Sequence, residues 1–313
     1  MNVVITGYFN DQSKQRIIQS FPGDWKIQIV EPQRIDEFIS EADVLIPEHI
    51  EVNESLLNKA HHLKFVQTGA GFDNVDIEAC SNRKIWVSNA AGVNANAVAE
   101  HILALILNYY KNISYLDRFM KNREDETKLE YIGGELFGKT IGTIGFGAIG
   151  SRVAELAKAF NMKVLAYDTN KNIQSDDVEL VDLDTLIKNS DVITINIFLD
   201  DSTRNLVDNT FLNKMKNNAL LVNTARGPIV CEVDLIKALK DNVIGGACLD
   251  VFTEEPLSLD SDLRNLGNVV LTPHTAGMPD GTKFHETRYR FFVQNILKIQ
   301  RNETPLNNLN QIK

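Results

Sequence analysis

Three strand-like runs of the chain are followed by side chains that could bind a carboxylate or transfer a proton. "ALLVN" leads into Arg226, "GGACLDVF" leads into two glutamates before Pro256, and "NVVLT" leads through a proline into His274. Arginine can hold a carboxylate and the adjoining carbonyl with its planar fork. Histidine transfers protons near neutral pH, and a neighbouring carboxylate would raise its pKa above about 6.5. Singly, such residues are more often surface charges or turn residues, so their meaning depends on what accompanies them.

A glycine-rich loop earlier in the chain supplies that context. Gly145, Gly147 and Gly150 form a G-x-G-x-x-G pattern between the apolar run "TIGTIG" and residues of helical spacing. Glycines let the backbone approach a pyrophosphate, whose charge meets the positive end of the following helix. The pattern therefore predicts a dinucleotide site. Its candidate residues are Gly145, Phe146, Gly147, Ala148, Ile149 and Gly150.

The next apolar run, "MKVLAYD", ends at Asp168. Its distance from the last glycine is close to the roughly 20 residues expected for an acid that binds a ribose diol. This acid would repel a 2′-phosphate, and the following "TNK" offers a single lysine to receive one. The sequence therefore favours NAD over NADP. A nicotinamide beside an arginine, a carboxylate and a histidine would form a complete site for reducing a 2-keto acid.

Short apolar runs alternate with amphipathic or polar stretches along the chain. This rhythm and the length of 313 residues predict an α/β fold with two doubly wound, mostly parallel sheets. Ligands of such sheets bind outside the carboxyl ends of the strands, where Arg226 and His274 fall. The expected strands are 2–6, 26–31, 43–47, 63–68, 85–89, 140–145, 163–168, 191–198, 219–223, 244–250 and 268–272, with one long helix over 94–121 and a last helix over 283–301.

Composition excludes several other classes of protein. The formal charge of −10 is spread along the chain, which argues against nucleic acid and anionic membranes as partners. We find neither an apolar run of membrane-spanning length nor an amino-terminal targeting signal. Three separated cysteines fit reduced thiols in the cytoplasm, and neither cysteines nor histidines show metal-ligand spacing. We therefore expect a cytoplasmic protein without a metal.

An ordered set of motifs resembles the D-isomer-specific 2-hydroxyacid dehydrogenase family over essentially the whole chain. The matching stretches are "GAGFDNVD", "NAVAEHILALIL", "GTIGFGAIGSRVA", "LLVNTARGPIV", "LDVFTEEPL" and "LTPHTAG". The resemblance implies a flavodoxin-like substrate domain of residues 1–95 and 285–313, and a Rossmann NAD domain of residues 96–284. It also implies a homodimer built around the long helix.

The same resemblance assigns individual residues. Arg226, Glu255 and His274 match the catalytic positions, and Glu255 is chosen over Glu254 because it directly precedes Pro256. The backbone around Ala70, Gly71 and Phe72 matches the loop that receives the substrate carboxylate together with Arg226. Further cofactor-binding residues that it implies are Thr203, Asn223, Thr224, Ala225, Asp250, His274 and Gly277, whereas His101 is expected to pack a helix.

Departures from the family's pattern narrow the substrate. Phosphoglycerate members carry Arg-Ser where this chain has "PEHI", and the Tyr-Ser-Pro stretch of D-lactate members is replaced by "AGVNANAVAEH". We therefore expect a small, unphosphorylated 2-keto acid, with side-chain preference set by loops 8–10, 47–50 and 278–289. The alternatives are an NAD(H)-sensing, corepressor-like binding protein without turnover and formate oxidation.

Overall fold

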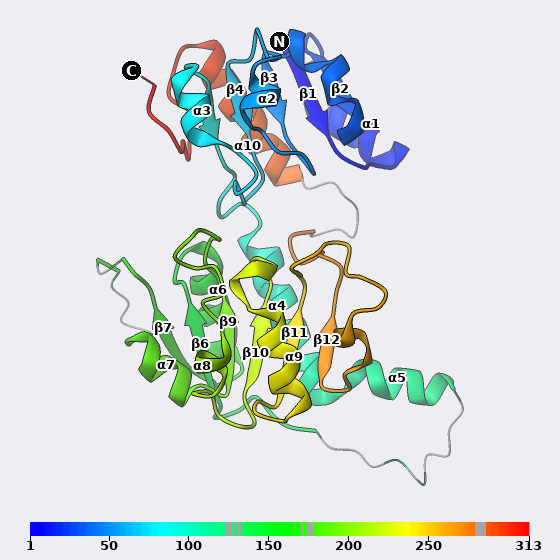
Figure 1. The fold of residues 1–313 in the computed structure, drawn as a ribbon, viewed down its shortest axis with the longest axis vertical. Coiled ribbons are helices and arrows are strands. Elements are labelled where there is room, and N and C mark those ends of the chain that lie inside the picture. Colours follow the sequence, from blue (N-terminus) through cyan, green and yellow to red (C-terminus); the bar gives the residue numbers. More distant parts are fainter. Residues whose placement is uncertain are drawn as a thin grey trace. The chain divides into compact units, whose positions relative to one another are not determined.

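The structure is a computed structural model that describes residues 1–122, 127, 129, 133–170, 172–173, 178–278 and 286–312. The chain divides into two compact units, Met1–Asn94 with Met278–Lys313 and Ala95–Gly277. Each unit is built on one parallel sheet (Figure 1). The predicted α/β fold with two doubly wound parallel sheets is thereby confirmed. Within the described part of the chain, we find no helix with the length and apolar character needed to span a bilayer.

The first unit holds a five-stranded sheet in the flavodoxin-like order β2-β1-β3-β4-β5. Alternate strand residues point to opposite faces, so Val4 and Leu45 pack with α2 and α3, whereas Ile5 and Ile46 pack with α1 and α10. Its elements are β1 (Asn2–Thr6), α1 (Asp11–Gln19), β2 (Lys26–Val30), η1 (Pro32–Glu37), η2 (Ile39–Glu41), β3 (Val44–Ile46), α2 (Glu54–Leu57), β4 (Phe65–Gln67), α3 (Ile77–Asn82), β5 (Trp86–Ser88) and α10 (Glu286–Gln300).

The second unit holds a seven-stranded sheet in the Rossmann order β12-β11-β10-β9-β6-β7-β8. Leu220 and Val222 face α4 and α6, and Leu221 faces α7, α8 and α9, so both faces are covered (Figure 1). Its elements are α4 (Ala95–Lys111), α5 (Ile113–Lys121), β6 (Thr140–Ile144), α6 (Ala148–Ala159), β7 (Lys163–Tyr167), β8 (Glu179–Leu180), α7 (Leu183–Asn189), β9 (Val192–Ile195), α8 (Asn209–Leu212), β10 (Leu220–Asn223), η4 (Gly227–Ile229), α9 (Glu232–Lys240), β11 (Gly246–Leu249), η5 (Asp262–Asn265) and β12 (Val269–Leu271).

The prediction of one uninterrupted helix over 94–121 is wrong. The helix breaks at Asn112, whose φ of 52° lies in the left-handed region that asparagine tolerates better than most residues. The Asn108 side chain then accepts hydrogen bonds from the backbone N–H (2.8 Å) and the hydroxyl (3.0 Å) of Ser114, which start α5. The last helix was expected over 283–301 and is described from Glu286 to Gln300; residues 283–285 lie outside the described part.

Candidate active site

The glycine loop connects β6 to α6 in a geometry that only glycine can adopt at two positions. Gly145 has a φ of +90°, and an added Cβ there would lie 2.5 Å from the Asn196 carbonyl oxygen. A Cβ on Gly150 would lie 2.1 Å from the Gly145 carbonyl oxygen, so α6 can approach the end of β6 only without a side chain. At Gly147, the residue before α6, a Cβ would meet nothing within 4 Å. The loop is therefore tight against the protein and open at the start of the helix.

Asp168 lies beside this loop, directly after β7. One carboxylate oxygen accepts the Phe146 backbone N–H at 2.8 Å, and the other accepts the Asn170 N–H at 2.8 Å. Each oxygen retains a second lone pair for a diol. The open start of α6 next to a fixed carboxylate fits the pyrophosphate and ribose of NAD.

Asn196 supports the same loop, and it was not among the site residues predicted from the sequence. It follows β9, its backbone N–H donates to the Ile144 carbonyl at 2.7 Å, and its side chain donates to the Thr194 hydroxyl at 2.9 Å. Its position directly past a buried strand is the signal that could have identified it, since the other candidates were found in that way.

Arg226 stands on a turn that the buried Asn223 side chain holds. The Asn223 amide accepts the Ala225 backbone N–H at 3.0 Å and donates to the Arg226 carbonyl at 2.9 Å. A Cβ on Gly227 would lie 2.0 Å from the backbone of Phe252, so the segments after β10 and β11 touch here. This contact brings the Arg226 turn next to the segment that carries Glu255. Thr224 is half-buried in the same turn.

His274 and Glu255 form a direct pair. The His274 Nδ1 lies 2.6 Å from one Glu255 carboxylate oxygen, and the Phe252 backbone N–H donates to the other at 3.1 Å. The side chains of the pair are 49% and 35% exposed, so both stay accessible from solvent. His274 has a φ of 54° and its backbone N–H donates to the Asp250 carbonyl at 2.8 Å. The pair therefore leaves the His274 Nε2 as the nitrogen that can face a ligand.

The charges of the site act on one another. The Glu255 hydrogen bond raises the pKa of His274 above its ordinary value, against burial and the positive charge of Arg226, which lower it. Burial favours the neutral acid of Glu255, yet its bond to His274 and the charges of His274 and Arg226 hold the Glu255 pKa below its ordinary value. The structure thus brings Arg226, Glu255 and His274 together as an electrostatically coupled group.

Asp250 is fully buried beneath this group. Its carboxylate accepts hydrogen bonds from the Thr272 hydroxyl at 2.6 Å, the Thr275 N–H at 2.9 Å and the Ala276 N–H at 2.8 Å. His101 on α4 extends the network, because its Nε2 lies 3.1 Å from the Thr272 hydroxyl. Asp250 therefore fixes the Thr272 side chain before His274 and the backbone after it.

Two other cofactor-binding candidates lie near strand ends of the second unit. Thr203 lies in the segment after β9, where its hydroxyl donates to the Phe198 carbonyl at 2.8 Å. Gly277 is half-buried at the end of the segment that follows β12. Their part in cofactor binding stays a prediction.

The predicted carboxylate loop belongs to the first unit and follows β4. The Gly69 carbonyl accepts the Ala90 N–H at 2.8 Å, and the Ala70 carbonyl accepts the Asn89 side chain at 3.1 Å. In a trans peptide the N–H points opposite to the C=O. The N–H groups of Ala70 and Gly71 therefore face away from the segment after β5, and Phe72 completes the loop with its carbonyl bonded to the Val75 N–H at 3.0 Å.

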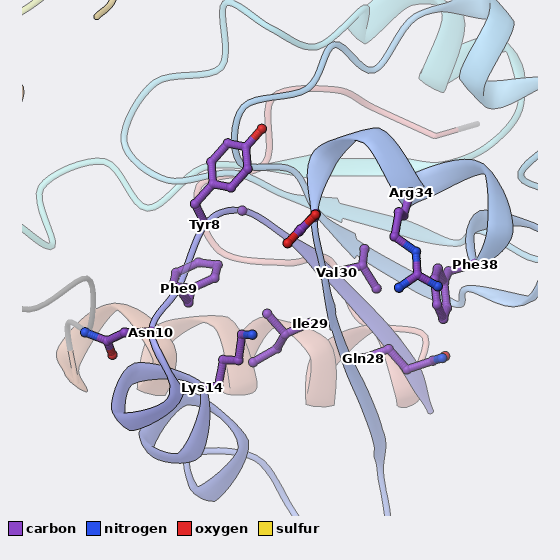
Figure 2. A pocket seen from close by; sticks show the side chains of 11 residues that line it. Tyr8, Phe9, Asn10, Lys14, Gln28, Ile29, Val30, Arg34 and Phe38 are labelled. Carbon is purple, nitrogen blue, oxygen red and sulfur yellow. The ribbon is translucent and has the colours of Figure 1, made fainter.

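The first unit also contains a cavity of about 670 Å³ where β1 and β2 end (Figure 2). Its lining includes Tyr8, Phe9, Lys14, Arg34 and Phe38, from the segment after β1, the first turn of α1 and the region of η1. None of the predicted site residues lines this cavity. The loop at 8–10, expected to shape the substrate pocket, contributes to it.

Comparison with known proteins adds independent findings. The family model for the NAD-binding domain of D-isomer-specific 2-hydroxyacid dehydrogenases matches residues 103–276. A glyoxylate reductase of Thermococcus litoralis is 37% identical over 289 residues, which cover 88% of this chain and 86% of that protein. Among solved structures, D-lactate dehydrogenase from Aquifex aeolicus complexed with NAD and lactic acid has a TM-score of 0.83 at 27% identity, over 96% of each chain. NAD-dependent formate dehydrogenase from Staphylococcus aureus in complex with NAD has a TM-score of 0.85 at 29% identity, over 100% of each chain.

Proposed function

Because the chain belongs to the D-isomer-specific 2-hydroxyacid dehydrogenase family, we propose that it reduces a small, unphosphorylated 2-keto acid to the D-2-hydroxy acid and catalyses the reverse oxidation. It is an oxidoreductase of 2-hydroxy acids with NAD as its cofactor. When bound, the nicotinamide supplies or receives the hydride. The remaining steps fall to the side chains of the site.

Arg226 binds the substrate carboxylate and the adjoining carbonyl oxygen. A guanidinium presents paired donors in a plane, which matches two oxygens of an α-keto acid. His274 holds a proton at Nε2 and donates it to the carbonyl oxygen during reduction, or removes the hydroxyl proton in the reverse direction. Glu255, bonded to Nδ1, keeps the imidazole charged and oriented.

The two units divide the binding work in this proposal. Residues 95–277 bind NAD through the glycine loop and Asp168, with further contacts from Thr203, Asn223–Ala225, Asp250 and Gly277. Residues 1–94 and 278–313 bind substrate, and the Ala70 and Gly71 N–H groups receive its carboxylate. We also propose a cytoplasmic homodimer that associates through α4 and α5. Exposed apolar residues on α5, among them Ile113 and Met120, support that assembly.

The observation that carries the proposal is the coupling of Arg226, Glu255 and His274 in the same unit as the glycine loop. The test is a substrate panel of glyoxylate, hydroxypyruvate, pyruvate, branched 2-keto acids and formate. Consumption of NADH with a keto acid, followed at 340 nm, supports it. Tight NADH binding without turnover would favour a sensor, and reduction of NAD by formate alone would favour formate oxidation.

Replacement of Arg226 tests the assigned substrate contact. Arg226→Ala should lower kcat/KM by about a hundredfold or more, because a preorganised donor of the site is lost. Arg226→Lys keeps the charge without the planar fork and should recover only part of the rate. NADH binding, measured by fluorescence, should persist in both variants. A near-normal rate in Arg226→Ala would remove the arginine from the site.

A further inference from the structure

An ion pair in the first unit brings together two segments that are far apart in the sequence. Glu48 follows β3 and Arg288 lies in the first turn of α10, and their oxygen and nitrogen atoms are 3.1 Å apart. The side chains are 26% and 23% exposed, so the pair is more shielded than an ordinary surface pair but still reached by solvent.

Both partners are held in place. The buried Thr6 hydroxyl donates to the Glu48 carbonyl at 2.8 Å and accepts the Glu48 N–H at 2.8 Å. The Arg288 guanidinium lies over the Tyr289 and Phe292 rings, at 5.4 and 5.7 Å from their centroids. Burial would lower the Arg288 pKa, but the Glu48 charge raises it above its ordinary value. The Glu48 backbone and the Arg288 guanidinium are thus held in place, and the two charges compensate each other.

The pair lies beside the predicted carboxylate loop. An added Cβ on Gly69 would be 3.8 Å from the Arg288 Nη1, so the guanidinium lies close to the residue that precedes the Ala70–Phe72 loop. The N–H groups proposed to receive the substrate carboxylate belong to the next residues, Ala70 and Gly71. The two charges therefore lie near the loop proposed to hold the substrate.

We propose that Glu48 and Arg288 form a charge filter that restricts turnover to 2-keto acids without a second negative charge. This inference rests on the proposed function, because it takes the loop of Ala70 and Gly71 as the carboxylate site. Arg288 alone would attract a dicarboxylic 2-keto acid. Glu48 neutralises that attraction and presents its own carboxylate to the incoming one.

The decisive variant is Glu48→Gln, which keeps the shape and removes the charge. We compare kcat/KM for 2-ketoglutarate with that for 2-ketopentanoate, and for oxaloacetate with that for 2-ketobutyrate, since each pair has the same number of carbons. The dicarboxylate-to-monocarboxylate ratio should rise at least tenfold. Glu48→Gln/Arg288→Gln should lose this gain, because the cation responsible for it is gone. An unchanged ratio in a folded Glu48→Gln would overturn the filter.

Glu51→Gln is the matched control, since it removes the same charge from an exposed position three residues later. Its ratio should equal that of the unmodified protein. If Glu48→Gln does not fold, Arg288→Gln decides the question, because it leaves Glu48 uncompensated. KM should then rise more for the dicarboxylates than for the monocarboxylates, and an equal rise would contradict the filter. Failure of the unmodified protein to reduce any keto acid would instead refute the proposed function.

Discussion

His274 is held at its backbone and at its ring by different acidic residues. Asp250 accepts the N–H groups of Thr275 and Ala276 through its carboxylate and that of His274 through its carbonyl, whereas Glu255 binds the ring nitrogen. The left-handed backbone at His274 is uncommon for a residue other than glycine and is stabilised by these bonds. The backbone position of His274 and the protonation of its ring are therefore controlled by different residues, so protonation can be changed while the backbone stays in place.

Glu255→Gln should change protonation while Asp250 keeps the backbone in place. Glu255 raises the His274 pKa, so the variant's His274 pKa should fall. Reduction needs the protonated imidazole. The kcat/KM for reduction should therefore be highest below the His274 pKa and should fall as the pH rises through that pKa. The variant should lose reductive activity at a lower pH than the unmodified protein. At a pH where only the unmodified protein keeps His274 protonated, the kcat/KM of the variant should be lower by about tenfold or more. Glu254→Gln, the exposed neighbour, should leave the pH profile of kcat/KM in place, and superimposable profiles for all three proteins would refute the role of Glu255.

At the scale of elements, the strands were predictable and the helix break was not. Strands such as Val192–Ile195 and Leu220–Asn223 are buried on both faces, so they are short apolar runs that can be recognised without knowing their neighbours. The two-residue strand Glu179–Leu180 is exposed and has no such pattern. Asn112 alone did not reveal the break because asparagine also occurs inside helices, and the Asn108 bond that starts α5 carries no pattern in the sequence.

The catalytic candidates were recognisable for the same reason as the strands. Arg226 follows the buried strand β10 and His274 follows the half-buried strand β12, and the parallel order of the strands places such ends on one edge of the sheet. The Glu48–Arg288 pair could not be anticipated, since it joins residues on different elements whose spacing carries no periodic signal. Asn196 also follows a strand, as Arg226 does, but an uncharged residue at such a position does not by itself indicate a catalytic or binding role.

The approach of α6 to β6 gives a prediction at this scale. Gly150→Ala adds a Cβ at 2.1 Å from the Gly145 carbonyl oxygen, so helix and loop must separate. The Kd for NADH should rise by about tenfold or more, equivalent to roughly 1.4 kcal/mol. Gly267→Ala, where a Cβ meets nothing within 4 Å, should bind NADH normally in the same fluorescence titration. Equal affinities would mean that the glycine loop does not bind the dinucleotide.

For the whole molecule, each sheet presents its chemistry at the carboxyl ends of its strands. In the second unit the glycine loop follows β6, Asp168 follows β7, and Arg226 follows β10. In the first unit Glu48 follows β3 and the Ala70–Phe72 loop follows β4. Two sheets of different strand order thus use the same edge, which assigns cofactor and acid–base chemistry to one unit and substrate selection to the other in the proposed function.

The proposed homodimer predicts what happens when the apolar surface of α5 becomes charged. Ile113 is 55% exposed and Met120 is 54% exposed, and their spacing of two helical turns places them on one face. Glutamate at both positions would have to be buried in the interface without a partner, which costs several kcal/mol. Ile113→Glu/Met120→Glu should therefore be a monomer by light scattering where the unmodified protein is a dimer. Val233→Glu, at a 77% exposed position of α9, should remain dimeric. A dimer that survives in the double variant would place the interface elsewhere.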